Sequence, residues 1–304
     1  MLLPAQIEVS LDATLRGHRA AVYAIDRTPE GDEVFSGAGD GMIARWLPES
    51  SADGEAVARL DSHIFSLLYL SESGSLIAGD MQGNIHFLPA NNPDDFRQTS
   101  LNSHAVYSMV RWQDDVFAGC GNGYIHRLSA DSAEVLQSVQ ISGRHIRCLY
   151  IVNDLLYAGC SDNCIYLLDP FDLSATAKQT GHQGSVFSLA FNPYLNQLLS
   201  GSMDAQVRIW TPDLDPVAAL EAHLFTVNAI AVHPEWPIFA TASRDKNIRI
   251  WDASNYTLLK VLTHDRYDGH THSVNKIFWS GSGGHLISCS DDRTLKVWDV
   301  RINL

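Results

Sequence analysis

The amino-acid sequence predicts an all-β fold, a seven-bladed β-propeller whose blades are four-stranded antiparallel sheets. Seven similar segments recur along the chain, and each ends in a tryptophan or a leucine; these ends are Trp46, Leu88, Leu128, Leu168, Trp210, Trp251 and Trp298. Successive ends lie 42, 40, 40, 42, 41 and 47 residues apart. Between them, short alternating apolar stretches such as SVFSLAF are bounded by Gly, Pro, Asn and Asp, which is typical of strands and tight turns. No segment carries a long helical pattern.

Each repeat also has an apolar residue at the start of its first predicted strand. These residues precede the terminal residue of their repeat by 22 or 24 positions, and they are Val22, Ile64, Val106, Ile146, Val186, Val227 and Val274. A unit of this length holds about four strands, which is too small a sheet to bury both of its faces. We therefore expect the units to stack radially and to form a single domain over residues 1–304.

The N-terminal segment is the candidate for closing the ring. IEVSLDATL alternates as a strand does, but no first three strands of a repeat precede it. After Trp298 only DVRINL remains, which is too short for another strand and its return. We expect the N-terminal strand to join the last blade as its outer strand, which leaves no exposed ring edge.

Composition limits the classes of function. The chain has 304 residues and a formal net charge of −14, which argues against broad electrostatic capture of nucleic acid or anionic membrane. It shows neither a secretory signal nor an apolar run of about 18 residues, the length that a membrane span needs. The odd number of cysteines (Cys120, Cys148, Cys160, Cys164 and Cys289) indicates reduced thiols, and we predict a cytoplasmic protein.

Four repeats carry a histidine, a Ser or Thr, an Asp and a Trp at fixed offsets. The sets are His18, Ser36, Asp40 and Trp46; His182, Ser200, Asp204 and Trp210; His223, Thr241, Asp245 and Trp251; and His270, Ser288, Asp292 and Trp298. This pattern resembles the hydrogen-bonded tetrad of the WD-repeat family, over nearly the whole chain. The resemblance implies that the His precedes the first strand, the Asp lies in the turn between the second and third strands, and the set is structural rather than a catalytic triad.

The second, third and fourth repeats depart from this pattern together. They replace the hydroxyl by Ala78, Ala118 and Ala158 and the tryptophan by leucine, and the turn position holds Gln82, Asn122 and Asp162. Since a half-satisfied buried network costs more than an apolar one, we expect these blades to be held by packing alone.

One register of the repeats predicts a binding surface. The residue after each inward apolar position is Tyr23, Phe65, Tyr107, Arg147, Phe187, Asn228 or Asn275. In WD-repeat propellers this position opens onto the upper mouth of the central channel, and so does the residue before the turn Asp: Gly39, Met81, Gly121, Ser161, Met203, Arg244 and Asp291. We add His145 to the predicted partner-binding set. Aromatics, methionine and arginine are typical of interface hot spots.

The two rims of the ring are predicted to differ in charge. The resemblance places PEGDE, PESSADGE, NNPDD, QDD, VNDL and TPDLDP on one rim, which is acidic. Basic residues on the opposite rim offset much of the negative charge there; they are Arg16, Arg19, Arg144, Arg147, Arg244, Lys246, Arg266 and Arg293.

We predict a non-catalytic scaffold that binds a peptide segment or partner protein at the upper mouth, with no cofactor, no metal, no nucleic acid and no membrane, as a monomeric propeller. The chain has no phosphate-binding glycine loop and no nucleophile elbow. An alternative is a propeller enzyme, or a small-ligand or metal binder, that uses the central channel through His63, His145 and Asp291. A third possibility is a subunit of a larger assembly that uses the acidic rim or the blade sides.

Overall fold

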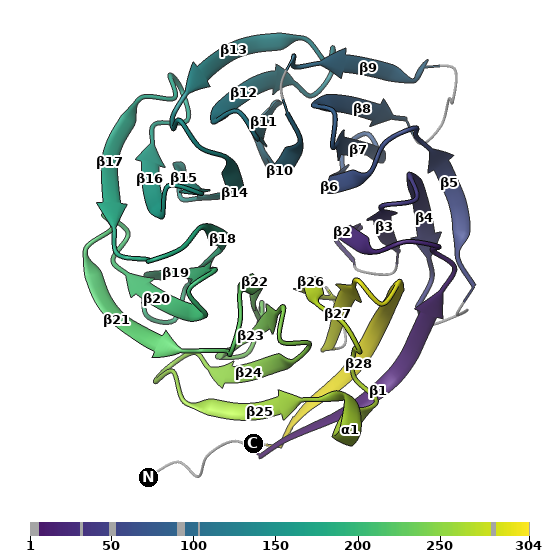
Figure 1. The fold of residues 1–304 in the computed structure, drawn as a ribbon, viewed down its shortest axis with the longest axis vertical. Coiled ribbons are helices and arrows are strands. Elements are labelled where there is room, and N and C mark those ends of the chain that lie inside the picture. Colours follow the sequence, from purple (N-terminus) through teal and green to yellow (C-terminus); the bar gives the residue numbers. More distant parts are fainter. Residues whose placement is uncertain are drawn as a thin grey trace.

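The computed structural model describes residues 6–30, 33–48, 53–89, 95–102, 104–280 and 284–303. Its strands form seven four-stranded sheets around a central axis (Figure 1). The predicted seven-bladed propeller is therefore confirmed, and a single short α-helix, α1 (His264–Tyr267), interrupts the strands of the described residues.

The blades follow the order of the repeats. Blade 1 contains β2 (Val22–Arg27), β3 (Val34–Ala38), β4 (Met42–Trp46) and β5 (Glu55–Arg59). Blade 2 contains β6 (Ile64–Leu70), β7 (Ser75–Asp80), β8 (Asn84–Leu88) and β9 (Arg97–Ser100). Blade 3 contains β10 (Val106–Trp112), β11 (Asp115–Cys120), β12 (Tyr124–Ser129) and β13 (Val135–Gln140). Blade 4 contains β14 (Ile146–Val152), β15 (Leu155–Cys160), β16 (Cys164–Leu168) and β17 (Ala175–Thr180).

The remaining blades repeat this arrangement. Blade 5 contains β18 (Val186–Asn192), β19 (Gln197–Ser202), β20 (Gln206–Trp210) and β21 (Pro216–Glu221). Blade 6 contains β22 (Val227–Val232), β23 (Ile238–Ser243), β24 (Ile248–Asp252) and β25 (Leu258–Leu262). Blade 7 contains β26 (Val274–Trp279), β27 (His285–Ser290), β28 (Thr294–Asn303) and, as its outer strand, β1 (Gln6–Arg16).

The ring is closed by the N-terminal strand, as the sequence predicts. β1 pairs antiparallel with β28 from Gln6 opposite Asn303 to Arg16 opposite Thr294. Figure 1 shows this pairing as a purple strand beside a yellow one. The start and the end of the described chain thus share one sheet.

Removal of residues 1–14 is expected to lower the melting temperature strongly, because β28 would keep β27 but lose most of its pairing with β1, and the ring would gain a free edge. Thermal melts followed by circular dichroism measure the effect. Ser10→Ala, at an exposed position of the same strand, is the control and should change the unfolding free energy by less than about 0.5 kcal/mol. An unchanged melt of the truncated chain would rule out the closing role.

Each blade buries its faces against its two neighbours. Trp46 of blade 1 is 1% exposed and packs with Leu15 and Val297 of blade 7. In blades 3, 4 and 5, a residue in the turn after the third strand packs into the seam with the preceding blade. These residues have a left-handed backbone and are Ala133 (φ 63°), Leu173 (φ 59°) and Leu214 (φ 70°).

A partly buried carboxylate joins blades 1 and 2. Asp26 on β2 accepts hydrogen bonds from the backbone amides of Tyr69 on β6 at 2.6 Å and of Arg27 at 2.9 Å. Burial raises the pKa of Asp26 to about 6, although both amides and the Arg27 charge act in the opposite direction. The ionised form is therefore disfavoured in the folded protein.

The stability of the wild-type chain relative to Asp26→Asn is expected to rise as the pH falls from about 7 to about 4. The folded state takes up the Asp26 proton near pH 6, whereas the unfolded chain takes it up near its ordinary value of 3.8. This displacement of about two pKa units corresponds to about 3 kcal/mol. Urea unfolding of both proteins across this range measures the difference, and a difference that does not vary with pH would contradict the assignment.

Candidate functional site

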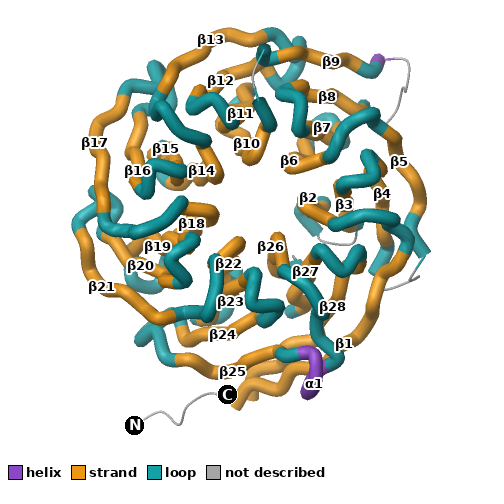
Figure 2. The backbone as a smooth tube through the Cα atoms, viewed as in Figure 1, coloured by secondary structure: helices purple, strands orange, loops and turns teal. Residues whose placement is uncertain are grey.

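The antiparallel strand order assigns every connection to one of two faces. Connections from the fourth strand to the next blade, and turns between the second and third strands, lie on what we call the upper face. Figure 2 shows these connections as teal segments that cross from the outer strands to the inner ones. The other two connections of each blade lie on the lower face.

A β-bulge occurs at the start of the innermost strand of every blade. The register between the first and second strands shifts at the second residue of the first strand. A bulge leaves its extra residue outside the hydrogen-bonded ladder and turns its side chain. The seven bulge residues are Tyr23, Phe65, Tyr107, Arg147, Phe187, Asn228 and Asn275.

The side chains of all seven bulge residues meet in one hollow, which we call the mouth cavity. Its volume is about 170 Å³, and Lys276 completes its lining. All eight lining residues are partly exposed. Residues that lie about 40 positions apart in the chain thus share a single surface at the centre of the ring.

Blades 1 to 5 contribute a continuous row of rings and one guanidinium. The ring centroid of Phe65 lies 5.1 Å from that of Tyr23 and 5.6 Å from that of Tyr107. Arg147 Cζ lies 4.5 Å from the Tyr107 centroid and 5.1 Å from the Phe187 centroid. Both distances are within the range of a cation–π interaction, so two rings hold the guanidinium in place.

Blades 6 and 7 contribute amides that tie neighbouring blades together. Asn228 Nδ2 donates to the carbonyl oxygen of Val274 at 2.9 Å. Asn275 Nδ2 donates to the carbonyl oxygen of Val22 at 2.8 Å and to Asp291 Oδ1 at 2.8 Å. These two asparagines therefore support the cavity wall as well as line it.

The other residues of the predicted partner-binding set lie around the mouth cavity and do not line it. Met81 and Met203 are 48% and 57% exposed, and Arg244 is exposed as well. His145 donates from Nδ1 to the Gly121 carbonyl, and its ring centroid lies 5.8 Å from that of Tyr107. Ser161 Oγ accepts a hydrogen bond from Arg147 Nε at 2.9 Å.

Sequence reasoning missed three residues of this surface. Leu224 and Phe225, in the loop before β22, are 77% and 58% exposed on the upper face. An adjacent Leu-Phe pair directly after His223 was the available signal. Lys276 was missed because strict strand alternation places it on the opposite side of the strand from Asn275. The bulge instead brings both residues to the cavity.

Four polar networks support the loops of the upper face. In blade 5, His182 Nδ1 lies 2.8 Å from Asp204 and Nε2 lies 2.7 Å from Ser200 Oγ, which also accepts from Trp210 Nε1 at 2.7 Å. The pKa of Asp204 falls to about 2; burial opposes this, but His182 and backbone amides outweigh burial. Each network thus links the loop before the first strand to the turn between the second and third.

The same bonds recur in blades 1, 6 and 7. The sets are His18, Ser36, Asp40 and Trp46; His223, Thr241, Asp245 and Trp251; and His270, Ser288, Asp292 and Trp298. The longest His–Asp distance, 3.4 Å, is between His18 and Asp40. The shortest are 2.8 Å, in blades 5 and 7.

The expectation that blades 2, 3 and 4 are held by packing alone is wrong. In blade 2, Asp80 is 1% exposed, accepts from the Asn84 amide at 2.8 Å and lies 3.1 Å from His86 Nε2. In blade 4, Asp162 accepts from the Tyr166 hydroxyl at 2.6 Å. A carboxylate removed from water needs donors, which come from the third strand in blade 2 and from the third strand together with Ser142 of the preceding loop in blade 4.

A regular spacing of residues in blades 2, 3 and 4 could have indicated these hydrogen bonds from the third strand. His86, His126 and Tyr166 lie 40 residues apart. Each is the cross-strand partner, on the neighbouring second strand, of the alanine that replaces the Ser or Thr of the other blades; these alanines are Ala78, Ala118 and Ala158. The larger third-strand side chain therefore occupies the side of the sheet where the hydroxyl is absent.

Ser200→Ala is expected to destabilise the protein by about 1–3 kcal/mol, because the substitution leaves the buried Trp210 N–H and His182 Nε2 without their partner. Urea unfolding monitored by tryptophan fluorescence measures the change. Ser254→Ala, at an exposed position of blade 6, is the matched control and should cost less than about 0.5 kcal/mol. Equal effects of the two substitutions would show that the network contributes no stability.

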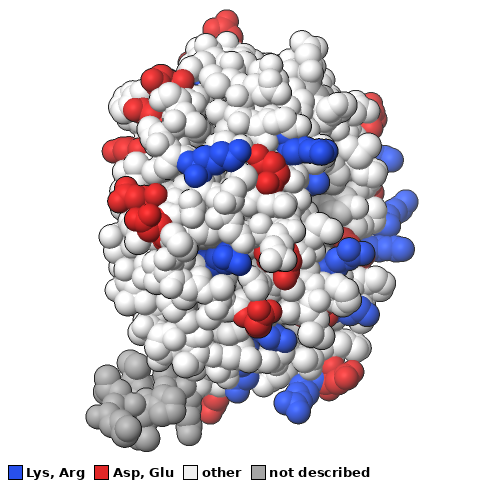
Figure 3. Space-filling view, turned by 60° about the vertical axis from the view of Figure 1, so that its left-hand side comes forward, with Lys and Arg blue, Asp and Glu red and all other residues white. Residues whose placement is uncertain are grey.

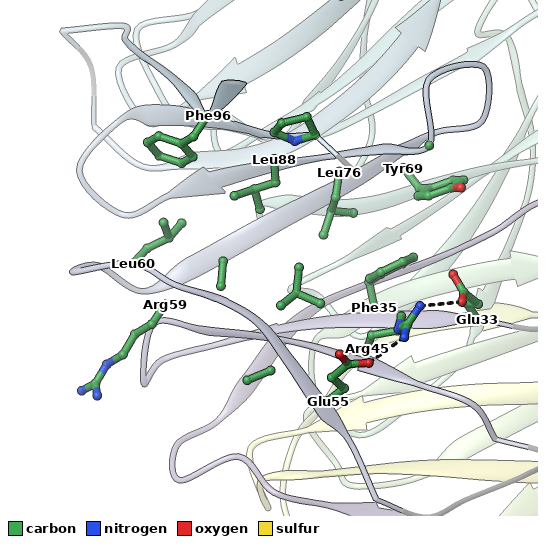
Figure 4. A pocket seen from close by; sticks show the side chains of 15 residues that line it. Glu33, Phe35, Arg45, Glu55, Arg59, Leu60, Tyr69, Leu76, Leu88 and Phe96 are labelled. Atoms are coloured by element: carbon green, nitrogen blue, oxygen red, sulfur yellow. Dashed lines mark hydrogen bonds and ion pairs between the residues drawn. The ribbon is translucent and has the colours of Figure 1, made fainter. Parts of the chain in front are cut away.

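A larger hollow of about 710 Å³ lies between blades 1 and 2 (Figure 4). Phe35, Tyr69 and Leu88 are among its apolar lining residues. Leu88 occupies the position of the seam-filling tryptophan of blades 1, 5, 6 and 7, and the smaller side chain leaves more room in this seam. Arg45 at one end pairs with carboxylates of the same blade, Glu33 and Glu55. None of the predicted partner-binding residues lines this hollow.

Charge is distributed unevenly over the wall of the ring. In Figure 3 acidic side chains gather toward the left edge, which belongs to the lower face, and basic side chains toward the centre and right. The segments predicted to make the lower rim acidic include residues 31–32, 49–52 and 91–94, which lie outside the described residues. The lining of the mouth cavity itself contains two cations and no carboxylate.

The candidates for channel chemistry are dispersed over different blades. His63 lies before β6, His145 before β14 and Asp291 after β27. Across the described residues, no three His, Cys, Asp or Glu side chains gather into a group that could hold a metal ion. In the same part of the chain, no helix has the length and apolarity needed to cross a membrane.

The bulges, turns and polar networks define a propeller of the WD-repeat class. The family model for the WD domain, G-beta repeat, matches residues 10–46, 174–211, 214–252 and 260–299, about half of the chain. The chain therefore belongs to the WD-repeat family. The matched units are those that carry complete His–Ser/Thr–Asp–Trp sets, and the unmatched ones are blades 2, 3 and 4.

Curated relatives are similar over part of the chain. The nuclear distribution protein PAC1 of Arthroderma benhamiae is 31% identical over 144 residues, which cover 43% of this chain and 30% of that protein. The probable coatomer subunit beta' of Schizosaccharomyces pombe is 32% identical over 133 residues, covering 42% and 16%. The probable cytosolic iron-sulfur protein assembly protein 1 of Yarrowia lipolytica is 37% identical over 84 residues, covering 27% and 24%. The match thus spans less than a third of each relative.

The fold is also similar to a solved structure, the WD40 β-propeller domain of Doa1. The TM-score is 0.84 at 20% sequence identity, and the alignment covers 96% of both chains. At this identity the similarity concerns the fold.

Proposed function

We propose that this chain is a non-catalytic protein-interaction module that binds a peptide segment or a loop of a partner protein at the mouth cavity. The observation that carries the proposal is the meeting of all seven bulge side chains in one hollow, with Arg147 held between Tyr107 and Phe187. Rigid rings and an oriented guanidinium lose little conformational entropy when a ligand binds, which is why such residues dominate interface hot spots.

The surroundings of the mouth cavity support a peptide rather than a cofactor as ligand. Four apolar side chains that are roughly half exposed or more, Met81, Met203, Leu224 and Phe225, belong to connections of the upper face. A segment that places one side chain in the cavity would cover some of them. The cavity, at about 170 Å³, is smaller than the roughly 300–1,000 Å³ typical of small-molecule sites.

Charge and relatives support proteins as the partner class. A net charge of −14 disfavours nucleic acid and anionic membrane. The relatives' names describe distribution, coat and assembly proteins, and none of these names is that of an enzyme. We propose that the chain acts as a single monomeric domain in the cytoplasm; the name of the Yarrowia lipolytica relative contains the word cytosolic.

Replacing Tyr107, Arg147 and Phe187 together by alanine is expected to abolish partner capture, because each hot-spot residue contributes about 30-fold or more in affinity. Affinity capture from native cell extract on the immobilised chain, followed by mass spectrometry, measures this loss. The melting temperature of the triple variant should stay close to that of the wild type.

The control triple variant changes the same residue types away from the mouth: Tyr194→Ala, Arg301→Ala and Phe171→Ala. These side chains are exposed, at 39%, 73% and 63%. The control is expected to retain the partners that the wild type captures. Partners that the mouth variant also retains would place the interface elsewhere.

A further inference from the structure

The mouth cavity contains a second cation, Lys276, in addition to Arg147. Lys276 follows the bulge residue Asn275 on β26, and both side chains line the cavity. Lys276 also lines a smaller hollow of about 110 Å³, together with Phe65 of blade 2 and Tyr107 of blade 3. Since these three residues are shared by both hollows, they lie at the boundary between them.

A lysine is exceptional in this register. The equivalent residues of the other six blades are all small: Ala24, Ser66, Ser108, Cys148, Ser188 and Ala229. Burial raises the pKa of the Cys148 thiol to about 12, and the charge of Lys276 partly opposes that rise. The ammonium of blade 7 therefore acts on a residue of blade 4 across the ring.

Neither cation of the cavity is neutralised by a carboxylate. Among the described residues, no ion pair or hydrogen bond involves Lys276 Nζ or the terminal nitrogens of Arg147; only Arg147 Nε is engaged, by Ser161. Asp291, the acid at the edge of the site, is bonded to Asn275 and is not part of the lining. The cavity lining thus holds two cations and no carboxylate, in a chain with a net charge of −14.

We propose that the mouth cavity is an oxyanion site, in which Arg147 and Lys276 together bind the carboxylate or phosphate at the tip of one side chain of the partner segment. This inference rests on the proposed function. A guanidinium whose terminal N–H groups are unused matches the two oxygens of such a group, and an ammonium adds a second charge-assisted hydrogen bond. The volume of about 170 Å³ suits one side-chain tip.

The test uses random twelve-residue peptides displayed on phage and selected on the full chain. Lys276→Met retains length and apolar surface but removes the charge. Lys246→Met is the matched control, because Lys246 is exposed on the same face outside the cavity. Wild type and control should enrich peptides that carry Asp or Glu beside an apolar residue. Lys276→Met should enrich the apolar residue without the acid.

The strongest wild-type peptide is then synthesised with its acid changed to the amide or to phosphoserine. The amide should weaken binding to the wild type by about 10- to 100-fold, and binding to Lys276→Met by less than about threefold. If phosphoserine binds more tightly than the carboxylate, the cavity favours phosphate; the reverse order favours carboxylate. Either order supports an oxyanion site.

Two results would overturn the inference. One is a set of wild-type peptides without acidic enrichment; the other is an acid-to-amide effect that Lys276→Met preserves. A failure of the proposed function differs from both. In that case, either no peptide would be enriched, or the triple variant of Tyr107, Arg147 and Phe187 would bind the selected peptides as the wild type does. Both outcomes would contradict the proposed interaction site and, with it, the oxyanion site.

Discussion

Closure of the ring by β1 is the interaction on which the rest of the molecule depends. A four-stranded blade cannot bury both of its faces, so each blade relies on two neighbours, and the pairing of β1 with β28 gives the last blade its full sheet. The closing strand also carries Leu15, which is fully buried beside Trp46 of blade 1. One pairing between the two ends of the described chain therefore contributes to two seams, the one with blade 1 and the one with blade 6.

Closure of the ring allows the seven bulges to form one surface. Because the seven innermost strands are fixed relative to one another, a one-residue irregularity in each sends seven side chains to one place. The partly buried carboxylates in the second-to-third-strand turns, including Asp204, link these turns to the loops that precede the bulges. The same hydrogen bonds thus stabilise the fold and fix the geometry of the mouth cavity.

The sequence predicts the blades, their number and the closing strand because spacing and apolar alternation depend on backbone geometry alone. It also identifies the seven residues that meet at the mouth cavity. The sequence does not predict Lys276, because strict strand alternation sends consecutive residues to opposite sides of the sheet. A bulge instead brings two consecutive residues, Asn275 and Lys276, to the same side. The sequence does not predict the bond between Asp80 and His86, because neither residue stands at a position of the His–Ser/Thr–Asp–Trp set. The two residues meet because their side chains are long enough to reach each other between neighbouring strands.

Charge placement explains how an acidic protein can select an anionic group. The two cations of the mouth cavity lie among aromatic rings, where water is partly excluded and charge-assisted bonds are stronger than at an open surface. The carboxylates of the lower face lie on the far side of the ring, and at physiological salt their repulsion decays over about 8 Å. An acidic segment is therefore repelled where it meets the lower face and attracted at the mouth, so the same charge distribution favours one orientation and opposes the other.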